Sequence, residues 1–371
     1  MTQLFSPLDL GSLRLENRIV VSPMCQYSSE DGCASDWHII HLGTLALSGA
    51  GLLLLEATAV EARGRISHAD LGLWDDATEA ALDRVLRIVR TYSRIPIGVQ
   101  LAHAGRKAST RRPWDGGGFL AADEPNGWQT ISASAEAFNP GEPVPVEATE
   151  ADIDEIVEAF ASSARRADRL GLDTIEVHGA HGYLIHQFLS PLSNHRTDLY
   201  GGSLENRMRL ALRVFDAVRA AFPSSKPVGM RVSATDWVEG GWDLDQTIAL
   251  AKALEARRCA YIDVSTAGNS PLQKITLAPG YQVPFAAGVK RAVSIPVFAV
   301  GLITDPQQAE DIIANGEADA IALARAILYD PRWPWHAAVK LGGRVDAPPQ
   351  YLRCEPAEAR GVFRKVARTG N

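Results

Sequence analysis

Eight short strand-like segments alternate with eight helix-like segments along this chain, and this alternation limits the possible folds more than any other feature. The strand candidates are β-branched or apolar runs at residues 17–24, 50–60, 95–105, 173–179, 226–234, 260–266, 295–303 and 318–325. Segments of helical period lie at residues 36–49, 77–93, 150–171, 203–222, 243–257, 283–293, 305–316 and 333–343. Such alternation predicts βα units around a parallel sheet. Eight units favour a closed (β/α)8 TIM barrel over an open doubly wound sheet, which usually has fewer strands and a Gly-rich first turn.

The same pattern predicts one α/β domain with one long insertion. The barrel is expected over residues 1–343 and a separate tail over residues 344–371. Residues 107–147, after the third strand, are rich in Gly, Pro and Trp and are too long for a simple connection. A barrel tolerates such an insertion at its rim, where it would roof part of a site. The tail is expected to be irregular, since Pro348 and Pro349 prevent a regular helix there.

The composition argues against several partners. The 371 residues have a formal net charge of -7, whereas nucleic-acid binding would require a basic face. We expect neither a membrane span nor a signal peptide, because no apolar run reaches about 18 residues and no basic segment precedes an apolar one at the N-terminus. The cysteines are scattered without a CxxC pair, which favours reduced thiols in the cytoplasm. They are Cys25, Cys33, Cys259 and Cys354.

Barrel enzymes place their active site at the C-terminal ends of the strands, so polar residues near those ends are candidates for one shared site. The stretch EVHGAHGYLIHQFLSP, residues 176–191, follows the fourth strand with three histidines and a tyrosine. The other strand ends supply further candidates, which are Pro23, Met24, Cys25, Tyr27, Ala57, Gln100, His103, Arg231, Gly301, Ala324 and Arg325.

The histidine-rich stretch is compatible with a metal site, an acid/base site or ordinary packing. Zinc needs three or four nitrogen, sulfur or carboxylate ligands, but the neighbouring strand ends offer two arginines, which repel a metal and favour an anion. We therefore expect no metal. His103 and His186 are interpreted as packing or capping groups. His178 and His181 can instead converge as donors on a single oxygen, with Tyr183 as the proton donor.

The arginines also indicate a phosphate-bearing cofactor. In such barrels the seventh and eighth strand ends commonly hold a phosphate through loop amides and a basic side chain. Gly301 and the pair Ala324 and Arg325 stand at those positions. Arg231 lies in the apolar strand pattern GMRVSA, so its side chain is expected to face the barrel interior or its mouth.

Four motifs together resemble the old yellow enzyme family of FMN-dependent ene-reductases. They are SPMCQYSSEDG (residues 22–32), QLAHAGRKA (100–108), HGAHGYLIHQFLSPLSNHRTDLYGGSLENRMR (178–209) and the strand of Arg231. The similarity extends over nearly the whole chain and is greatest to the bacterial branch of thermophilic-type enzymes and xenobiotic reductases. Cys25 distinguishes this branch from relatives that have Thr there.

The resemblance implies a role for each candidate. FMN, bound without a covalent link, would be surrounded by Pro23, Met24, Cys25, Ala57, Gln100 and Arg231, and its phosphate would be held by Gly301, Ala324 and Arg325. NADPH or NADH would reduce it. An activated alkene, conjugated to a carbonyl or nitro group, would then receive hydride from flavin N5 at its β-carbon. His178 and His181 would hold the substrate oxygen, Tyr183 would protonate the α-carbon, and Tyr27 would line the substrate pocket.

The chain departs from the family pattern at two positions. Its C-terminal tail, in contrast, shares a motif with some members of the family. It has Ala324 before Arg325 where the family usually has Gly, and Val300 where many xenobiotic reductases have Trp, which would open the pocket. QYLR, residues 350–353, resembles a tail motif whose arginine reaches into a neighbouring subunit. We therefore expect a homodimer or homotetramer in which Arg353 contacts the neighbouring site.

Other functions remain as alternatives. A dihydrouridine synthase is a related flavin barrel but would require a basic RNA-binding surface. A dihydroorotate dehydrogenase usually has its catalytic Cys or Ser on a different loop and lacks the His-His-Tyr turn. A metal-dependent hydrolase or a flavin-free binding module would give a colourless protein. The expected function is thus an NAD(P)H-dependent ene-reductase of small molecules in the cytoplasm, without nucleic-acid or membrane partners.

Overall fold

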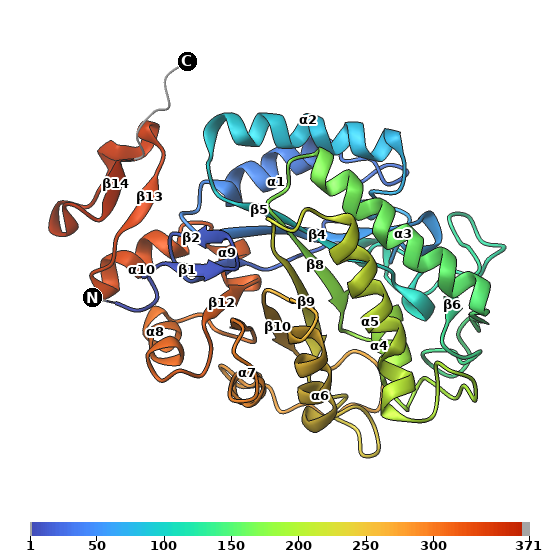
Figure 1. The fold of residues 1–371 in the computed structure, drawn as a ribbon. Coiled ribbons are helices and arrows are strands. Elements are labelled where there is room, and N and C mark those ends of the chain that lie inside the picture. The colour runs from blue at the N-terminus through green and yellow to red at the C-terminus, as the bar shows by residue number, and fades with distance from the viewer. Residues whose placement is uncertain (1, 366–371) are drawn as a thin grey trace.

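A closed barrel of eight parallel strands forms the centre of the computed structural model, which describes residues 2–365 (Figure 1). The barrel strands are β3 (Ile19–Val21), β4 (Leu52–Ala59), β5 (Ile97–Ala102), β8 (Thr174–Gly179), β9 (Val228–Ser233), β10 (Ile262–Ser265), β11 (Val297–Ala299) and β12 (Ala320–Leu323). Each falls inside one of the eight segments predicted from the sequence. The predicted (β/α)8 barrel is therefore confirmed.

Helices follow the strands and cover the outside of the barrel. They are α1 (Asp36–Ala46), α2 (Asp76–Tyr92), α3 (Glu150–Arg169), α5 (Leu204–Ala221), α6 (Leu244–Glu255), α7 (Val283–Lys290), α8 (Pro306–Ala314) and α10 (Trp333–Leu341). Asp75, Ser203 and Asp243 each accept a backbone N–H from the first turn of the helix that follows. The short helices α4 (Leu184–Leu189) and α9 (Arg325–Tyr329) were not predicted, because one or two turns are too short to show a helical period.

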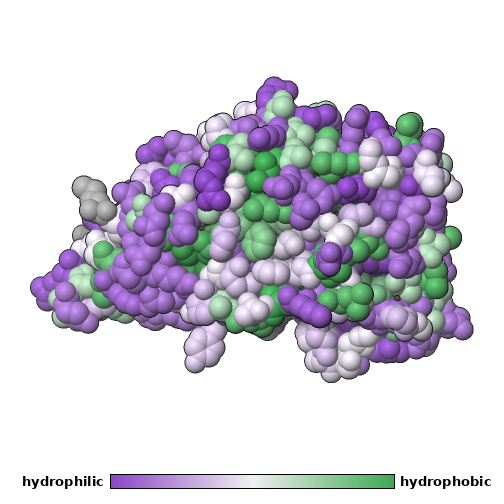
Figure 2. All heavy atoms as spheres, turned by 90° about the horizontal axis from the view of Figure 1, so that it is seen from below, coloured by the Kyte–Doolittle hydropathy of each residue, from purple (hydrophilic) through white to green (hydrophobic). Residues whose placement is uncertain are grey.

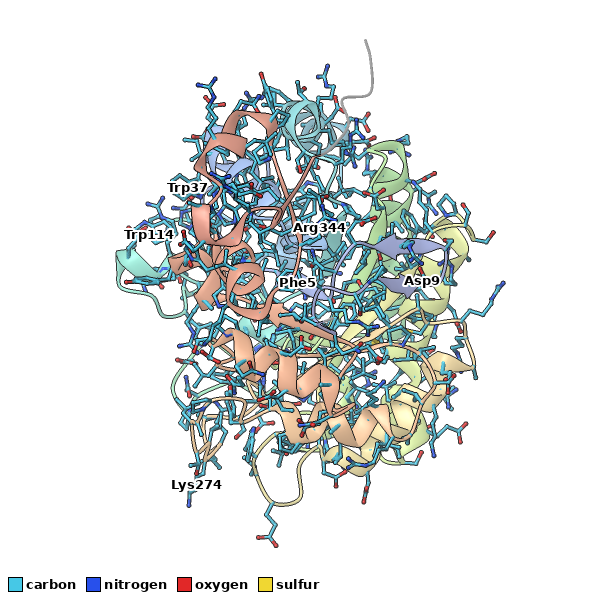
Figure 3. All side chains as sticks on the ribbon, turned by 90° about the vertical axis from the view of Figure 1, so that its left-hand side faces the viewer. Phe5, Asp9, Trp37, Trp114, Lys274 and Arg344 are labelled. Carbon is cyan, nitrogen blue, oxygen red and sulfur yellow. The ribbon has the colours of Figure 1, made fainter. Side chains whose placement is uncertain are left out.

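An N-terminal hairpin closes one end of the barrel. Its strands β1 (Leu8–Leu10) and β2 (Leu13–Leu15) are antiparallel and bury leucines against the first residues of the barrel strands, among them Leu52 and Tyr261. Figure 3 views this end and shows Asp9 on the hairpin. Because this end is covered, a ligand must enter through the opposite end, where the strands finish.

The chain between β5 and α3 lies at that opposite end. It contains the 3-10 turns η2 (Gly105–Lys107) and η3 (Pro113–Asp115) and the two-residue strands β6 (Ile131–Ser132) and β7 (Val146–Glu147). Trp114 of η3 is exposed and lies at the edge of the molecule in Figure 3. These residues thus add a layer of loops beside the barrel mouth.

The C-terminal tail is more regular than the sequence indicated. Strands β13 (Val345–Ala347) and β14 (Phe363–Lys365) pair in parallel, and the 3-10 turns η4 (Pro349–Cys354) and η5 (Ala357–Ala359) lie between them. The prolines do prevent an α-helix, but Val345 and Phe363 pack on Trp335 of α10. The tail lies at the left of Figure 1, across the barrel from β6.

The outer surface is mostly hydrophilic on the face seen from below. Figure 2 shows apolar side chains grouped near the middle of this face, with hydrophilic side chains around them. Folded proteins commonly expose apolar atoms in this way. Among the described residues, no helix combines the length and the apolar character needed to cross a bilayer.

Candidate active site

The candidate residues of the middle strands meet at the mouth of the barrel. In the sheet register His178 of β8 is paired with Arg231 of β9. On the other side of β8, Gln100 of β5 is paired with Glu176, and it is also paired with Ala57 of β4. Side chains from four strands therefore face one region of the structure.

The turn after β8 places two imidazoles and a phenol against each other. The ring centroid of His178 is 5.1 Å from that of His181 and 5.0 Å from that of Tyr183, and both contacts are edge-to-face. His178 Nε2 and His181 Nδ1 are 3.4 Å apart. A single oxygen atom beside these two nitrogens can bind both.

This turn depends on glycine at its centre. His181 and Gly182 have left-handed φ angles of 59° and 71°. A Cβ at position 182 would lie 2.1 Å from the carbonyl oxygen of Gly268. The sequence GAHGY therefore allows a close approach of two backbone segments that another residue would prevent.

Burial sets the protonation of the turn. Burial, and second the charge of Arg231, lower the pKa of His178 and of His181 well below the ordinary 6.5. Burial raises the pKa of Tyr183 well above 10. At neutral pH the turn thus presents two neutral imidazoles and a protonated phenol. Because the N–H of Ala180 donates to His178 Nδ1 at 3.2 Å, the ring proton of His178 lies on Nε2.

Two further residues hold the turn in place. Lys107 Nζ donates to the carbonyl oxygen of His181 at 2.8 Å and lies 5.1 Å from the ring centroid of Tyr183. Burial lowers the pKa of Lys107 to about 8. Ser265 Oγ is 2.8 Å from His181 Nε2. The sequence did not indicate either residue, since Lys107 belongs to the insertion and Ser265 to an apolar strand.

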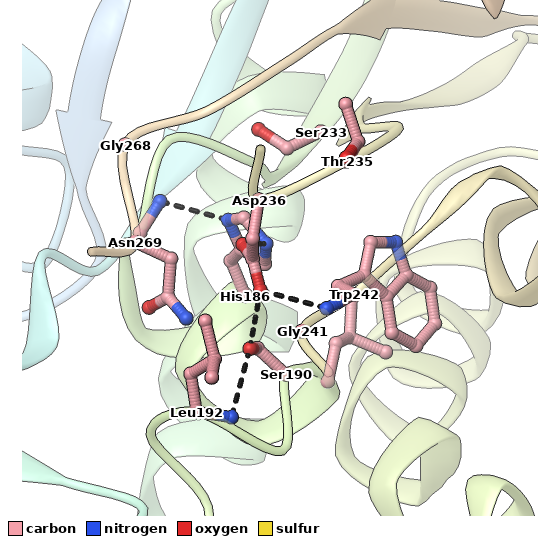
Figure 4. Close-up of polar contacts among 12 residues, drawn as sticks. His186, Ser190, Leu192, Ser233, Thr235, Asp236, Gly241, Trp242, Gly268 and Asn269 are labelled. Atoms are coloured by element: carbon pink, nitrogen blue, oxygen red, sulfur yellow. Dashed lines mark hydrogen bonds and ion pairs between the residues drawn. The ribbon is translucent and has the colours of Figure 1, made fainter. Parts of the chain in front are cut away.

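His186 supports the same turn and contacts the buried carboxylate of Asp236 (Figure 4). Its Nδ1 accepts the N–H of Gly182 at 2.9 Å, and its Nε2 lies 3.0 Å from Oδ1 of Asp236. Asp236 also accepts the hydroxyl of Ser190 and the N–H of Trp242. Burial raises the pKa of Asp236, but His186 and these donors outweigh burial and lower it. No spacing in the sequence had indicated this partner for His186.

His103 has a similar arrangement on the neighbouring strand end. Its Nδ1 accepts the N–H of Gly105 at 3.0 Å, and its Nε2 lies 2.8 Å from Oε1 of Glu61. His103 is buried, and Glu61 comes from the loop after β4. The contacts of His103 thus join two rim segments.

Arg231 lies beside two buried carboxyl groups inside the barrel. Its Nε is 3.4 Å from Oδ2 of Asp263, and its Nη1 donates to Ser22 Oγ at 2.8 Å. Glu176 accepts from Gln100 Nε2 at 2.8 Å. Burial, with the nearby Asp263, raises the pKa of Glu176 to about 8, so Glu176 keeps its proton at neutral pH. The carboxyl group closest to the positive charge of Arg231 is then that of Asp263.

The segment after β3 forms another wall of the mouth. The candidate residues in it, Pro23, Met24, Cys25 and Tyr27, are all partly buried. Burial, with the acidic Asp70 and Glu56, raises the pKa of the Cys25 thiol well above 9, so the thiol stays protonated. Tyr27 has a left-handed φ of 49°.

Glu56 supports this wall, Asp70 lies near it, and neither was found from the sequence. The register of β4 against β5 shifts at Glu56, next to Ala57. Glu56 Oε2 accepts the N–H of Gln26 at 2.9 Å, while Oε1 lies 3.2 Å from His38 Nε2. Burial raises the pKa of Asp70 to about 7. A β-bulge is the signal that would have identified Glu56, but it depends on pairing that no single strand reveals.

The ends of the seventh and eighth strands lie on the remaining side. Gly301 has a φ of 120°, and a Cβ there would lie 2.7 Å from Gln282 Nε2. Ala324 precedes α9, and Arg325 is its exposed first residue. The first N–H groups of a helix have no partner within the helix, so they are available to an anion.

Arg353 is not brought to this site within the chain. It is an exposed residue of η4, in the tail that packs on α10. Among residues 2–365, no group of three or more His, Cys, Asp or Glu side chains is arranged to hold a metal ion.

A (β/α)8 barrel with such a mouth has the architecture of an enzyme, and sequence comparison defines which kind. Residues 3–342 match the model of the NADH:flavin oxidoreductase / NADH oxidase family. The chain therefore belongs to this family. It is an oxidoreductase of the old yellow enzyme type that uses FMN with NAD(P)H as reductant.

Relatives match over nearly the full chain. An NADPH dehydrogenase of Geobacillus sp. (strain WCH70) is 45% identical over 95% of this chain and 98% of its own length. An NADH:flavin oxidoreductase of Gibberella zeae is 42% identical over 93% of this chain and 87% of its own.

Solved structures share the fold. Morphinone reductase in complex with tetrahydroNAD has a TM-score of 0.76 at 28% identity, covering 98% of this chain and 94% of its own. A 2-naphthoyl-CoA reductase complex has a TM-score of 0.81 at 25% identity over 92% of this chain, which spans only 52% of that longer protein.

The mouth fits a bound flavin on two observations. The Arg231 guanidinium is 5% exposed, and its Nε has no hydrogen-bond partner among the described residues. A buried guanidinium with free donors suits an electron-rich ligand. Gly301 keeps its strand end free of a side chain, so backbone there can approach a ligand closely.

Proposed function

We propose that this protein reduces the C=C bond of small alkenes conjugated to a carbonyl or nitro group. The observation that carries the proposal is the 3.4 Å separation of His178 Nε2 and His181 Nδ1, beside a protonated Tyr183. Two neutral imidazole nitrogens this close together can both donate to one oxygen that gains negative charge, as an oxyanion hole does. A phenol on the same turn suits delivery of a proton to a nearby carbon.

Each residue of the turn has a distinct role in this proposal. His178 donates from Nε2, because its Nδ1 accepts the N–H of Ala180. His181 donates from Nδ1 when Ser265 donates its hydroxyl proton to Nε2. Tyr183 gives its proton to the α-carbon. Bound FMN supplies the hydride that reduces the β-carbon.

The other candidates would hold the cofactor and substrate. Pro23, Met24, Cys25, Ala57 and Gln100 would surround the flavin ring, and Tyr27 would line the substrate pocket. Arg231 would supply positive charge to the ring, for which its burial near the end of β9 is suited. Gly301, Ala324 and Arg325 would hold the phosphate.

An anaerobic titration tests the proposed reaction. The purified yellow protein should lose its flavin absorbance when NADPH is added, and a stoichiometric amount of 2-cyclohexenone should restore it and yield cyclohexanone. Reoxidation by oxygen with no reaction of the enone would contradict the proposal. The cross-subunit contact of Arg353 stays a prediction, and light scattering is its first test, because a monomer would exclude it.

Replacement His178→Ala should weaken the binding of phenols, which place an oxygen where the substrate oxygen would lie. Loss of one donor to a charged oxygen costs about 1.5–3 kcal/mol, so we expect Kd to rise by about 10- to 100-fold. The measurement is a titration of the phenol–flavin charge-transfer band. His195→Ala is the control, since His195 is exposed and pairs with Glu136. Equal Kd values in both variants would refute the role of His178.

A further inference from the structure

A second cavity opens on the rim beside the mouth. Its volume is about 730 Å³, and it is lined by residues from three segments, which follow β3, β4 and β5. Its polar lining includes Arg63, Arg65, Arg112 and His68, and Trp128 adds an indole ring. Ligand pockets commonly have volumes of about 300–1,000 Å³.

The three arginines differ in how far their charge is already balanced. Arg63 forms ion pairs with Glu61 at 2.6 Å and Asp152 at 3.2 Å. Arg112 pairs with Asp115 in the same exposed turn at 2.6 Å. Arg65 donates to backbone carbonyl oxygens at 2.9 and 3.2 Å, and no ion pair of Arg65 is found among the described residues. Arg65 is therefore a cation without a carboxylate partner.

Aromatic contacts fix the position of that cation. The Arg65 guanidinium lies 5.5 Å from the ring centroid of Trp74 and 5.1 Å from that of Trp128. Trp128 is itself held, because its Nε1 donates to the carbonyl oxygen of Arg63 at 2.9 Å. A preorganised guanidinium loses little freedom on binding a phosphate. His68 adds a buried Nδ1 that has no hydrogen-bond partner within residues 2–365.

Two acidic residues also line the cavity, but they oppose an anion weakly. Glu30 and Asp31 are exposed, so water and salt screen their charges. Arg65 is partly buried between two indoles, where its interactions are screened less. The attraction of Arg65 for an anion therefore outweighs the repulsion by Glu30 and Asp31.

The cavity lies close to Tyr27, which is proposed to line the substrate pocket. Tyr27 contacts Trp114 edge-to-face at 6.0 Å, and the Arg112 guanidinium lies 5.5 Å from the ring centroid of Trp114. Ser29, two residues after Tyr27, lines the cavity directly. A long nucleotide whose reactive end lies at Tyr27 can extend over this part of the rim.

We propose that this cavity binds the 2′-phosphate of NADPH through Arg65 and Arg112, and so makes the enzyme prefer NADPH to NADH. The inference rests on the proposed function only in that the nicotinamide enters the same mouth. NADPH carries a 2′-phosphate and NADH does not. Two arginines that bind this phosphate would therefore distinguish the two reductants.

Isothermal titration of the holoenzyme with adenosine 2′,5′-bisphosphate and with 5′-AMP tests the site without any turnover. Arg65→Gln and Arg112→Gln should each raise the Kd of the bisphosphate by about tenfold or more, and that of 5′-AMP much less. Arg84→Gln is the matched control. Arg84 lies on α2 and forms an exposed ion pair with Asp36 of α1, so this variant also removes one positive charge. Arg112→Gln removes an exposed ion pair and a contact with the exposed Trp114, so this variant should fold and keeps the test valid if Arg65→Gln does not fold.

The steady-state counterpart is the ratio of the KM for NADPH to the KM for NADH. This ratio should rise by about tenfold in both cavity variants and stay constant in the control. Unchanged bisphosphate binding, or equal weakening for 5′-AMP, would overturn the 2′-phosphate assignment. If enones are not reduced while bisphosphate binding still depends on Arg65 and Arg112, the proposed function fails and the inference stands.

Discussion

Replacement Tyr183→Phe is expected to slow the oxidation of the reduced enzyme by an enone by about 10²- to 10⁴-fold, the range of a lost general acid. Reduction by NADPH should change little, because it needs no proton from Tyr183. Phenylalanine keeps the ring that contacts His178 at 5.0 Å, so the shape of the turn is retained. Stopped-flow absorbance of the flavin measures the two half-reactions separately.

The pH dependence distinguishes Tyr183 from its neighbour Lys107. Burial raises the pKa of Tyr183 well above 10, so the phenol remains a donor throughout the neutral range and up to about pH 10. The pKa of Lys107 is lowered to about 8, so its charge is lost as the pH rises through 8. A decline of the enone rate centred near pH 8 would therefore implicate Lys107.

Tyr329→Phe is the control for this experiment, because Tyr329 is 94% exposed on α9. It should leave both half-reactions as in the unmodified enzyme. Equal slowing of both half-reactions in Tyr183→Phe would mean that the phenol positions ligands in general, and the assignment of a proton donor would be wrong.

The barrel could be predicted from the sequence because each strand and helix carries its own period. Even the parallel arrangement follows from alternation alone. The N-terminal hairpin could not be found, since three residues such as Leu8–Leu10 are too few for their alternation to be distinguished from chance. The tail was misjudged for a related reason. Its prolines were visible, but the packing of Val345 and Phe363 on Trp335 depends on chain segments that meet only in the fold.

The residues of the site also divide into those that could be predicted from the sequence and those that could not. His178, His181 and Tyr183 lie within one short stretch, so their proximity could be read directly. The residues that hydrogen-bond to this stretch come from other strands and loops. Ser265 lies on β10, and Lys107 lies in the insertion. Contacts between distant segments leave no pattern in the local sequence. The carboxylate partners of His103 and His186 therefore could not be predicted.

Removal of the buried carboxylate in Asp236→Ala should lower the free energy of unfolding by about 3–5 kcal/mol, because the donors of Ser190, Trp242 and His186 would be left buried without an acceptor. Asp236 and His186 are fully buried, and Asp236 also accepts from Ser190 and Trp242. The fold lowers the pKa of Asp236, so its stabilisation is present above the unfolded pKa near 3.8 and is lost as the pH falls through the lower, folded value. Urea unfolding at several pH values measures both effects.

The same variant should also disturb the active site, because His186 holds the N–H of Gly182 between His181 and Tyr183. Without Asp236 the imidazole can move its proton to Nδ1, which then faces the Gly182 N–H as a second donor. Phenol binding should therefore weaken along with stability. Asp216→Ala is the control, since its pair with Arg257 is at the surface and is worth at most about 1 kcal/mol. A stability loss equal to that control would show that the buried pair does not hold the turn. Lost stability with unchanged phenol affinity would limit Asp236 to the core.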